Sequence, residues 1–451
     1  MLLPLNYNNH QKYLTQLPKI PQTITDIKTL YTPRDFYLSM IKSIADAQQR
    51  IYLVALYVEQ DQGGQRILEA LYTAKRNVPS LDIVVLVDWH RAQRGRIGVI
   101  SDHTNAKWYR QMAQMHSDVD LPIFGVPVNT REALGVLHLK GFIIDNTVIY
   151  TGASLNDVYL HQKNNYRYDR YHFIYNPLLA ETLLTYIKQK LLSAQAVTCL
   201  NNFSCSKILK IKNNARLLRQ ALRNSYYHHQ GKATQNELSV TPLVGLGKKN
   251  PLNQTIHHLL NSTCDTLILC TPYFNLPRLL VRDLIKLLRL GKKIEIIVGD
   301  KTANDFYIPT DQPFKIIGSL PYFYEINLRN FLYRLQQYID NGQMIIRLWK
   351  NERNSYHVKG IWIDEKWQLL TGNNFNPRSW RLDLENALLI HDPNQDLLLQ
   401  REQELKHIRT YTKVIQHFTE LEKIADYPVK VRKLIRRLRR IRVDRLINHL
   451  L

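Results

Sequence analysis

The chain has 451 residues, of which 45% are hydrophobic and 22% charged, and its 61 Lys+Arg against 38 Asp+Glu give a formal net charge of +23. This apolar content is enough for a large core and excludes a disordered or low-complexity chain, and four cysteines are too few for a disulfide framework. The positive charge predicts an anionic partner: nucleic acid, a nucleotide or an anionic membrane surface. Because no signal-peptide pattern and no run of about 18 apolar residues occurs, we expect a cytoplasmic protein without a membrane-spanning helix.

Predicted helices and strands follow one another in an order that occurs twice. The first copy predicts a helix from Thr32, which can cap it, a buried strand at 50–59, a helix at 64–75 and a buried strand at 81–90. The second copy predicts a helix near 253–262, a strand at 265–275, a helix at 277–290 and a strand at 293–301. Near-continuous Ile, Leu and Val runs between helices are typical of parallel strands covered on both faces. The sequence therefore predicts two α/β halves.

The predicted domain limits follow from this repeat. The first half takes residues 1–200 and the second takes residues 250–425. Between them, residues 201–249 are rich in Asn, Lys, Arg and Gly and predict a basic linker that contains a helix. The last forty or so residues predict helix up to about Ala425, a break at Tyr427-Pro428, and a basic amphipathic helix within residues 426–451.

One short motif follows the two-strand unit of each half. Both instances fit HxKxxxxD, and they are His138-Leu-Lys140 with Asp145 and His357-Val-Lys359 with Asp364. A single histidine on a strand is more often structural than catalytic, but two copies at equivalent places of a duplicated unit favour catalysis. Asp145 and Asp364 end the apolar runs, so we predict that they hold turns and take no part in the chemistry.

The motif spacing predicts a site for phosphoryl chemistry. Alternate side chains of an extended strand share a face, so the histidine and the lysine of each motif project together. Two such strands that meet across a pseudo-twofold axis bring two imidazoles and two ammonium groups to one point. One imidazole can attack phosphorus, the other can protonate the leaving oxygen, and the lysines can hold the nonbridging oxygens. We expect no metal and no cofactor, because the lysines provide the cationic clamp.

The duplicated motif, with a glycine and an asparagine after each copy, resembles the phospholipase D superfamily. The resemblance covers residues 32–393, and stretches such as ALYVEQDQGGQRIL, VDWHRAQR and LTGNNFNPRSWRLDLENALLI resemble the branch that transfers phosphatidyl groups from CDP-diacylglycerol to L-serine. It implies an α/β fold of two homologous phospholipase D-like halves, each a mostly parallel or mixed sheet flanked by helices, with the active site at the pseudo-twofold interface. It also implies CDP-diacylglycerol and L-serine as substrates and phosphatidylserine and CMP as products.

The resemblance implies a role for each histidine and for two carboxylates. His138 would attack the diacylglycerol-linked phosphorus and form a phosphatidyl-histidine, and His357 would act as general acid and then as base for the serine hydroxyl. In the superfamily a carboxylate from the opposite half orients each histidine, which pairs Asp169 with His357 and Glu385 with His138. Such a partner fixes the tautomer and stabilises the imidazolium. A surface salt bridge is the alternative interpretation of each carboxylate.

Two further sets of side chains are candidates for binding the substrate. The superfamily usually has GSxN after the motif, whereas this chain has one residue more in Gly152-Ala-Ser-Leu-Asn156 and in Gly372-Asn-Asn-Phe-Asn376. Asn156 and Asn376 match each other and are expected to bind phosphate oxygens, with Ser154 or Asn374 as the alternatives. The nucleotide-binding candidates at the ends of equivalent strands are Asp88, His90, Arg91, Arg94 and Tyr273. Arginine suits the pyrophosphate, although the same charges can simply solvate a loop.

The C-terminal segment is the most basic part of the chain. From Pro428 onward, nine lysine and arginine residues stand against one aspartate, and apolar residues recur at helical spacing. The cations expected to face an anionic membrane are Lys430, Arg432, Lys433, Arg436, Arg437 and Arg440. We expect peripheral association with the inner face of the cell membrane, with a few leucines inserting. Nucleic acid, including ribosomal RNA, would attract the same charges, and docking on the body of the protein is compatible with either.

The sequence leaves several alternatives open. A phospholipase D or a cardiolipin synthase would carry the same motifs, although the latter usually has N-terminal membrane-spanning helices. A nuclease or a nucleic-acid binder is supported by charge alone, and superfamily nucleases typically have one motif per chain. The oligomeric state, including a homo-oligomer, the acyl-chain preference and the basis of serine selectivity are not predicted.

Overall fold

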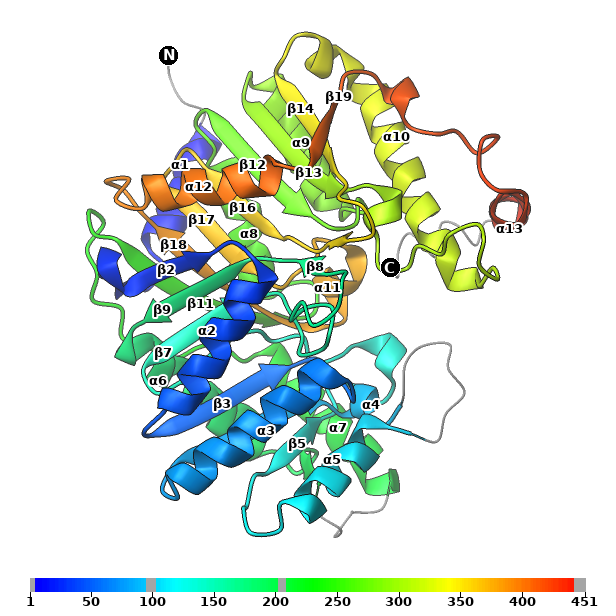
Figure 1. Ribbon diagram of the computed structural model, residues 1–451. Coiled ribbons are helices and arrows are strands. Elements are labelled where there is room, and N and C mark those ends of the chain that lie inside the picture. The colour runs from blue at the N-terminus through cyan, green and yellow to red at the C-terminus, as the bar shows by residue number, and fades with distance from the viewer. Residues whose placement is uncertain (1–4, 95–102, 202–207, 442–451) are drawn as a thin grey trace.

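The computed structural model describes residues 5–94, 103–201 and 208–441, and it consists of two α/β halves (Figure 1). In Figure 1 the first half, blue to cyan, lies below the second half, yellow to orange. Each half is a mixed sheet flanked by helices, so the predicted fold class is confirmed.

The first half is built on an eight-stranded sheet. In spatial order its strands are β10 (Thr198–Cys199), β5 (Ile123–Val126), β4 (Asp82–Asp88), β3 (Arg50–Ala55), β6 (Phe142–Ile144), β7 (Thr147–Thr151), β9 (Tyr171–Tyr175) and β2 (Ile27–Leu30). Only β3, β4 and β5 run parallel, and these are the near-continuous apolar strands. The other neighbours in this sheet pair antiparallel.

The second half repeats this order and adds one strand. Its nine strands are β1 (Ile20–Pro21), β11 (Ser239–Leu246), β18 (Leu384–His391), β17 (Trp367–Thr371), β16 (Gly360–Ile363), β12 (Thr266–Thr271), β13 (Lys293–Gly299), β14 (Met344–Trp349) and β19 (Thr412–Ile415). β12, β13 and β14 are the parallel set, equivalent to β3, β4 and β5. Because strand order and direction agree from edge to edge, the two halves are copies of one topology.

Most helices cover the outer faces of the sheets, and the inner faces share a core. Two helices, Pro177–Tyr186 and Leu398–Arg409, instead pack on the inner side. The helices of the first half are α2 (Pro33–Asp46), α3 (Gln62–Asn77), α4 (Trp89–Ala92), α5 (Asn105–Met115) and α6 (Pro177–Tyr186), which continues as a π-helix, Ile187–Leu192. Those of the second half are α8 (Pro251–Asn261), α9 (Arg278–Arg289), α10 (Leu320–Asp340), α11 (Pro377–Arg381) and α12 (Leu398–Arg409). The shared core joins side chains such as Val54 and Leu86 of one sheet to Val244 and Leu388 of the other.

The remaining elements are short or lie outside the repeat. They are α1 (Leu5–Thr15), α7 (Ile208–Arg223), α13 (Val429–Arg440) and the 3-10 turns Ile24–Asp26, Glu132–Leu134, Lys301–Ala303, Ile316–Ser319 and Phe418–Glu420. A parallel two-stranded ribbon joins the halves through β8 (Arg167–Tyr168) and β15 (Ser355–Tyr356). The predicted cap is present, because the Thr32 side chain accepts a hydrogen bond from the backbone N–H of Asp35 at 3.1 Å.

The structure differs from the predicted domain limits at three places. β11 lies inside the predicted linker, yet it occupies the place in the second sheet that β2 occupies in the first; Pro242 and Gly245 interrupt its apolar pattern and hide the strand. Residues 5–21 belong with the second half, since α1 packs on α8 and β1 pairs with β11. The helix expected up to about Ala425 ends at Arg409, and strand β19 follows.

Candidate active site

A cavity of about 930 Å³ lies between the halves, and both contribute to its lining. Its polar lining includes His138, Lys140 and Asn156 from the first half and His357 and Asn376 from the second. Its apolar lining includes Phe306, Tyr307, Ile308, Ile317 and Leu320, from the segment that leads into α10. A cavity with charged and apolar parts suits an amphiphilic ligand.

Two backbone contacts across the halves place each carboxylate beside a histidine. In the β8–β15 ribbon, the backbone N–H of His357 donates to the carbonyl of Tyr168 at 2.8 Å. On the other side, a parallel bridge joins Leu137 to Leu384, and the backbone N–H of His138 donates to the carbonyl of Leu384 at 3.0 Å. Asp169 directly follows Tyr168, and Glu385 directly follows Leu384. The same backbone contact, made once in each half, therefore places Asp169 beside His357 and Glu385 beside His138.

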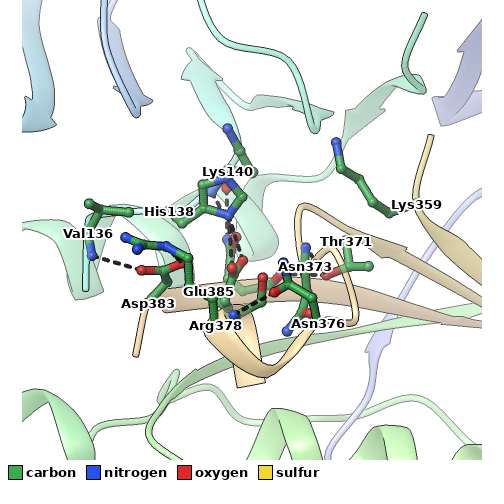
Figure 2. A network of polar contacts seen from close by, with 12 residues as sticks. Val136, His138, Lys140, Lys359, Thr371, Asn373, Asn376, Arg378, Asp383 and Glu385 are labelled. Carbon is green, nitrogen blue, oxygen red and sulfur yellow. Dashed lines mark hydrogen bonds and ion pairs between the residues drawn. The ribbon is translucent and has the colours of Figure 1, made fainter. Parts of the chain in front are cut away.

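His138 is paired with Glu385 (Figure 2), as the sequence analysis paired them. Its Nδ1 lies 2.9 Å from each carboxylate oxygen. Burial and the nearby charge of Lys140 lower the pKa of His138 well below its ordinary value, while burial raises the pKa of Glu385 to about 8. Within the described part of the chain, Nε2 of His138 has no hydrogen-bond partner. The ring is thus neutral, with one nitrogen unpaired at the cavity.

His357 is paired with Asp169, again as predicted, and its surroundings are more crowded. Its Nδ1 lies 2.7 Å from Oδ2 of Asp169, and the ammonium of Lys359 donates to the same oxygen at 3.0 Å. Burial opposes ionisation of Asp169, but Lys359 and His357 outweigh it and lower the pKa of this carboxyl below its usual range. Burial and Lys359 lower the pKa of His357 to about 3. The hydroxyl of Tyr159 lies 3.1 Å from Nδ1 and 3.2 Å from Nε2.

The two motif lysines lie differently with respect to the cavity. Lys140 lines it, with its ammonium 3.5 Å from the carbonyl of Ala153. The Lys359 side chain is 0% exposed and turns to Asp169 and the His357 ring. Burial lowers the pKa of each lysine to about 8, so both are mainly charged at pH 7. The two ammonium groups are close enough to lower each other's affinity for protons, but only Lys140 is placed to touch a ligand.

Each motif histidine and lysine precedes the strand in which it was expected. β6 begins at Phe142 and β16 at Gly360, because the backbone of the motif bonds to the other half. Asn386 accepts from the backbone N–H of Lys140 at 2.8 Å and donates to its carbonyl at 2.7 Å. Arg170, held by a buried ion pair, donates to the carbonyl of Lys359 at 3.3 Å. Asn386 and Arg170 directly follow the two carboxylates, and nothing else in the sequence pointed to them.

The last residue of each motif holds a turn, which confirms the structural prediction for Asp145 and Asp364. Both have a φ of 50°, in the left-handed region that aspartate tolerates. The Asp145 carboxylate accepts hydrogen bonds from the backbone N–H groups of Gln48, Gln49 and Arg50. The Asp364 carboxylate accepts from those of Cys264, Asp265 and Thr266. Each carboxylate thereby ties the end of its motif strand to the start of the strand beside it.

The asparagines predicted to bind phosphate both line the cavity. The Asn376 side chain caps α11 by accepting from the backbone N–H of Ser379 at 2.9 Å. The Asn156 oxygen accepts from the backbone N–H of Tyr159 at 3.2 Å, and its amide donates to the Tyr57 hydroxyl at 3.3 Å. The alternatives Ser154 and Asn374 also line the cavity, so the cavity brings all four together.

The structure separates the five nucleotide-binding candidates. Arg91, Arg94 and Tyr273 line the cavity, whereas Asp88 and His90 do not. Asp88 is 0% exposed, and its two oxygens accept at 2.8 Å from the backbone N–H groups of Arg91 and Leu137. Nε2 of His90 lies 2.7 Å from the carbonyl of Asn129. The predicted nucleotide contact is therefore wrong for Asp88, because the surrounding backbone uses both of its oxygens, and Asp88 instead holds the segment before His138. His90 lies outside the cavity lining, and its contact with a nucleotide stays a prediction.

Three cavity residues near His357 were not predicted: Tyr159, Arg167 and Asp305. The Arg167 guanidinium lies 3.5 Å from the Asp305 carboxylate and 4.8 Å from the centre of the Tyr159 ring. A signal existed for Arg167, which stands two residues before Asp169 as Asp383 stands before Glu385. No repeat marks Asp305. Among the residues that the structure describes, no group of three or more His, Cys, Asp or Glu could hold a metal ion.

The basic helix α13 packs against the second half. Val431 and Ile435 are buried in a cluster with Tyr322, Phe323 and Ile326 of α10. The exposed cations are Lys430, Lys433, Arg436, Arg437, Arg439 and Arg440, while Arg432 is half-buried and donates to the carbonyl of Ala425. The prediction of a cationic amphipathic helix is confirmed as far as Arg440, and Arg442 and Arg445 lie outside the described residues. Val431 and Ile435 are already covered by α10, so this part of the apolar face docks on the body of the protein, and insertion of leucines into a membrane stays a prediction.

Within residues 5–94, 103–201 and 208–441, no helix combines the length and the apolar character needed to cross a membrane.

Comparison with known proteins gives close relatives. The family model described as "Cardiolipin synthase, PLD-like domain" matches residues 256–409. The chain is 60% identical to the CDP-diacylglycerol--serine O-phosphatidyltransferase of Escherichia coli (strain K12) over 100% of both chains, and 47% identical to that of Haemophilus influenzae over 98% of both. The crystal structure of the H. influenzae phosphatidylserine synthase superposes with a TM-score of 0.95 at 45% identity, covering 99% of this chain and 100% of that chain.

Proposed function

This chain belongs to the CDP-diacylglycerol--serine O-phosphatidyltransferase family, and from this premise we propose that it transfers the phosphatidyl group of CDP-diacylglycerol to L-serine and releases CMP. The observation that carries the proposal is the crossed arrangement of the cavity, in which each histidine is paired with a carboxylate of the opposite half. Two imidazoles at one cavity provide what a double displacement at phosphorus needs, a nucleophile and an acid–base group.

In the first step, Nε2 of His138 attacks the phosphorus that carries diacylglycerol. A phosphorus–nitrogen bond forms, the bond from that phosphorus to the bridging oxygen breaks, and CMP leaves with a proton from His357. The unpaired Nε2 of His138 supports this assignment, since Nδ1 is held by Glu385. His357 is neutral in the empty cavity, and the negative charge of a bound diphosphate favours its protonation. The proton for the leaving group is therefore taken up together with the substrate.

In the second step, the serine hydroxyl attacks the phosphatidyl-histidine. His357, now neutral, accepts the hydroxyl proton, the new phosphorus–oxygen bond forms, and the phosphorus–nitrogen bond breaks to free His138. Asp169 is ionised and stabilises the imidazolium of His357. Lys140 holds the nonbridging oxygens, and Asn156 and Asn376 face the same phosphate. Arg91 and Arg94 remain as candidates for the nucleotide phosphate.

The reaction is tested by supplying CDP-diacylglycerol in mixed micelles with and without L-serine. We expect serine-dependent release of CMP and equimolar phosphatidylserine. CMP release that does not respond to serine would make the protein a hydrolase of the superfamily, and no CMP release in either arm would sink the proposal.

We also propose that the protein binds the anionic inner face of the cell membrane peripherally, from the cytoplasm, through α13. The exposed cations of α13 carry the attraction, at about 1 kcal/mol for each residue near the surface. The Ile316–Ser319 turn packs against α13; Ile316 is 72% exposed and Ile317 lines the cavity. A membrane that contacts α13 would therefore lie beside the entrance for the lipid substrate.

Membrane binding is tested by replacing Arg436, Arg437 and Arg440 together with glutamine and sedimenting the protein with vesicles. We expect weaker binding to vesicles that contain phosphatidylglycerol and little binding of either protein to neutral phosphatidylcholine. The control is Arg76→Gln, which removes an exposed cation of the first half. Unchanged sedimentation of the triple variant would contradict the proposal, and loss of RNA binding alone would assign the helix to nucleic acid.

A further inference from the structure

L-Serine, the second substrate of the proposed reaction, carries two charged groups that take no part in the transfer of the phosphatidyl group. Free L-serine has an ammonium and a carboxylate at neutral pH, and its nitrogen and its carboxylate carbon are each three bonds, or roughly 3 Å, from its hydroxyl oxygen. An acceptor site that selects serine over water therefore needs a cation and an anion together, near the base that activates the hydroxyl.

Arg167 and Asp305 form such a pair on the cavity lining. Nη1 of Arg167 and Oδ2 of Asp305 are 3.5 Å apart, and each side chain is 17% exposed. This distance is long for a charge-assisted hydrogen bond, which is usually 2.7–2.9 Å. Each group also has a hydrogen bond to another residue: Nε of Arg167 donates to Ser355 at 3.2 Å, and the Tyr273 hydroxyl donates to Asp305. The two charges are thus held in place but not closely joined.

The pair lies against His357. The Arg167 guanidinium lies over the Tyr159 ring, and the hydroxyl of this ring is 3.2 Å from Nε2 of His357. Tyr273, which holds Asp305, meets the His357 ring edge-on with 6.4 Å between ring centres. Tyr159 therefore contacts both Arg167 and His357, and Tyr273 contacts both Asp305 and His357, so the charged pair and the base line the same part of the cavity.

We propose that Arg167 and Asp305 are the specificity residues for serine: Arg167 binds its carboxylate and Asp305 its ammonium, so that the hydroxyl points to His357. The inference rests on the proposed function. It predicts that serine enters between two side chains that pair loosely with each other in its absence.

The charged pair nearest to His138, Arg378 and Asp383, has no such freedom. Arg378 and Asp383 are 3.0 Å apart. Arg378 also donates to the carbonyl of Glu132 at 2.9 Å, and Asp383 accepts from the backbone N–H of Val136 at 3.0 Å. These side chains are occupied in holding the His138 segment, as Figure 2 shows for Arg378, Asp383 and Val136. An acceptor site beside His357 and none beside His138 agrees with their separate roles.

The test uses Arg167→Gln and Asp305→Asn in the full-length protein with CDP-diacylglycerol micelles. We expect the KM for serine to rise roughly 10- to 100-fold in each, the effect of losing one charge-assisted hydrogen bond, with a smaller fall in kcat at saturating serine. Ethanolamine, which lacks the carboxylate, should respond only to Asp305→Asn. 3-Hydroxypropionate, which lacks the ammonium, should respond only to Arg167→Gln. Both are measured as alternative acceptors or competitors of serine.

Matched controls are Arg76→Gln and Asp118→Asn, which break an exposed Arg–Asp pair of the first half. Arg167→Lys and Asp305→Glu, which keep the charges, should restore part of the serine affinity and guard against variants that do not fold. An unchanged KM for serine, or a fall in kcat with no rise in this KM, would overturn the inference. Wild-type protein that releases no CMP in response to serine would overturn the proposed function instead.

Discussion

His138 and His357 occupy equivalent places in the two halves, and each meets a carboxylate through the same backbone contact, yet the two pairs differ in charge. Asp169 is kept ionised by Lys359, because the Lys359 ammonium and Nδ1 of His357 both contact Oδ2 of this carboxylate. Glu385 has no lysine within hydrogen-bonding distance among the described residues, and burial raises its pKa to about 8. The site with the ionised partner can stabilise an imidazolium before any bond is made, which suits an acid–base histidine.

The pair with the raised carboxyl pKa suits the other task. A nucleophilic imidazole becomes positively charged when it forms a bond to phosphorus, and the Glu385 carboxyl, by accepting from Nδ1–H of His138, keeps Nε2 as the attacking nitrogen. Nε2 of His138 is also the nitrogen without a described partner, whereas Nε2 of His357 meets the Tyr159 hydroxyl. One duplicated motif thus yields two functions because its two lysines are arranged differently, Lys359 on Asp169 and Lys140 on the carbonyl of Ala153, and because Tyr159, outside the motif, meets His357.

Replacing His138 or His357 with alanine should have the largest effects and should separate the roles of the two histidines. His138→Ala should lower turnover by roughly 10⁴-fold or more, because no nucleophile remains, and no labelled lipid should be trapped on the protein. His357→Ala should also stop turnover but still form some adduct, since the nucleophile and Lys140 remain. The measurement is acid-quenched labelling with CDP-diacylglycerol carrying a radioactive acyl chain. An adduct in His138→Ala that is absent in His357→Ala would reverse the two roles.

Replacing the carboxylates should separate the two pairs by charge. Asp169→Asn removes an ionised partner and leaves Lys359 buried without a counter-charge, so kcat should fall roughly 10³- to 10⁴-fold. Glu385→Gln replaces a group that is mainly neutral at pH 7, so the loss should be roughly 10- to 100-fold, the scale of a lost orienting partner. Steady-state CMP release under saturating serine measures both. Equal losses in the two variants would show that the charge difference has no catalytic meaning.

The lysines should set the alkaline limit of activity. Burial lowers the pKa of Lys140 and Lys359 to about 8, so both are charged below that pH and lose their charge above it. We expect kcat/KM for CDP-diacylglycerol to fall above pH 8, at up to about tenfold per pH unit for each lysine. Lys140→Arg, whose guanidinium stays charged, should retain more of its activity at pH 9 than wild type does. A wild-type profile that stays level to pH 10 would be incompatible with these lowered pKa values.

The repeat and its chemistry could be predicted from the sequence, because strand-forming runs and the HxKxxxxD spacing are local patterns. The pairing of Asp169 and Glu385 across the halves followed from the superfamily resemblance and agrees with the observed contacts. Their roles, like those of the other site residues, stay predictions until the variants are measured.

The errors have a common physical cause, which is that a side chain's partners depend on segments distant in the chain. Asp88 was a sound candidate by its place at a strand end, but the backbone of Leu137, brought there by folding, takes one of its oxygens. Arg167 and Asp305 come close to each other only when the β8–β15 ribbon brings the halves together, so their pairing could not be predicted from the sequence. Strand β11 went undetected because its pairing with β18 outweighs the Pro242 and Gly245 in it.

The equivalent aspartates Asp145 and Asp364 make the same contacts in the two halves, so we expect their substitutions to have equal effects on stability. Each carboxylate accepts backbone N–H groups at the start of the neighbouring strand, and each residue has a φ of 50°. Alanine loses these bonds and is disfavoured at that φ, so each substitution should lower the free energy of unfolding by about 3 kcal/mol. Thermal melts of Asp145→Ala and Asp364→Ala should shift alike, against a control in the exposed Asp120→Ala. Well below the melting temperature, kcat should be unchanged, and a loss of kcat without a loss of stability in either variant would mean that the motif aspartate acts in the chemistry after all.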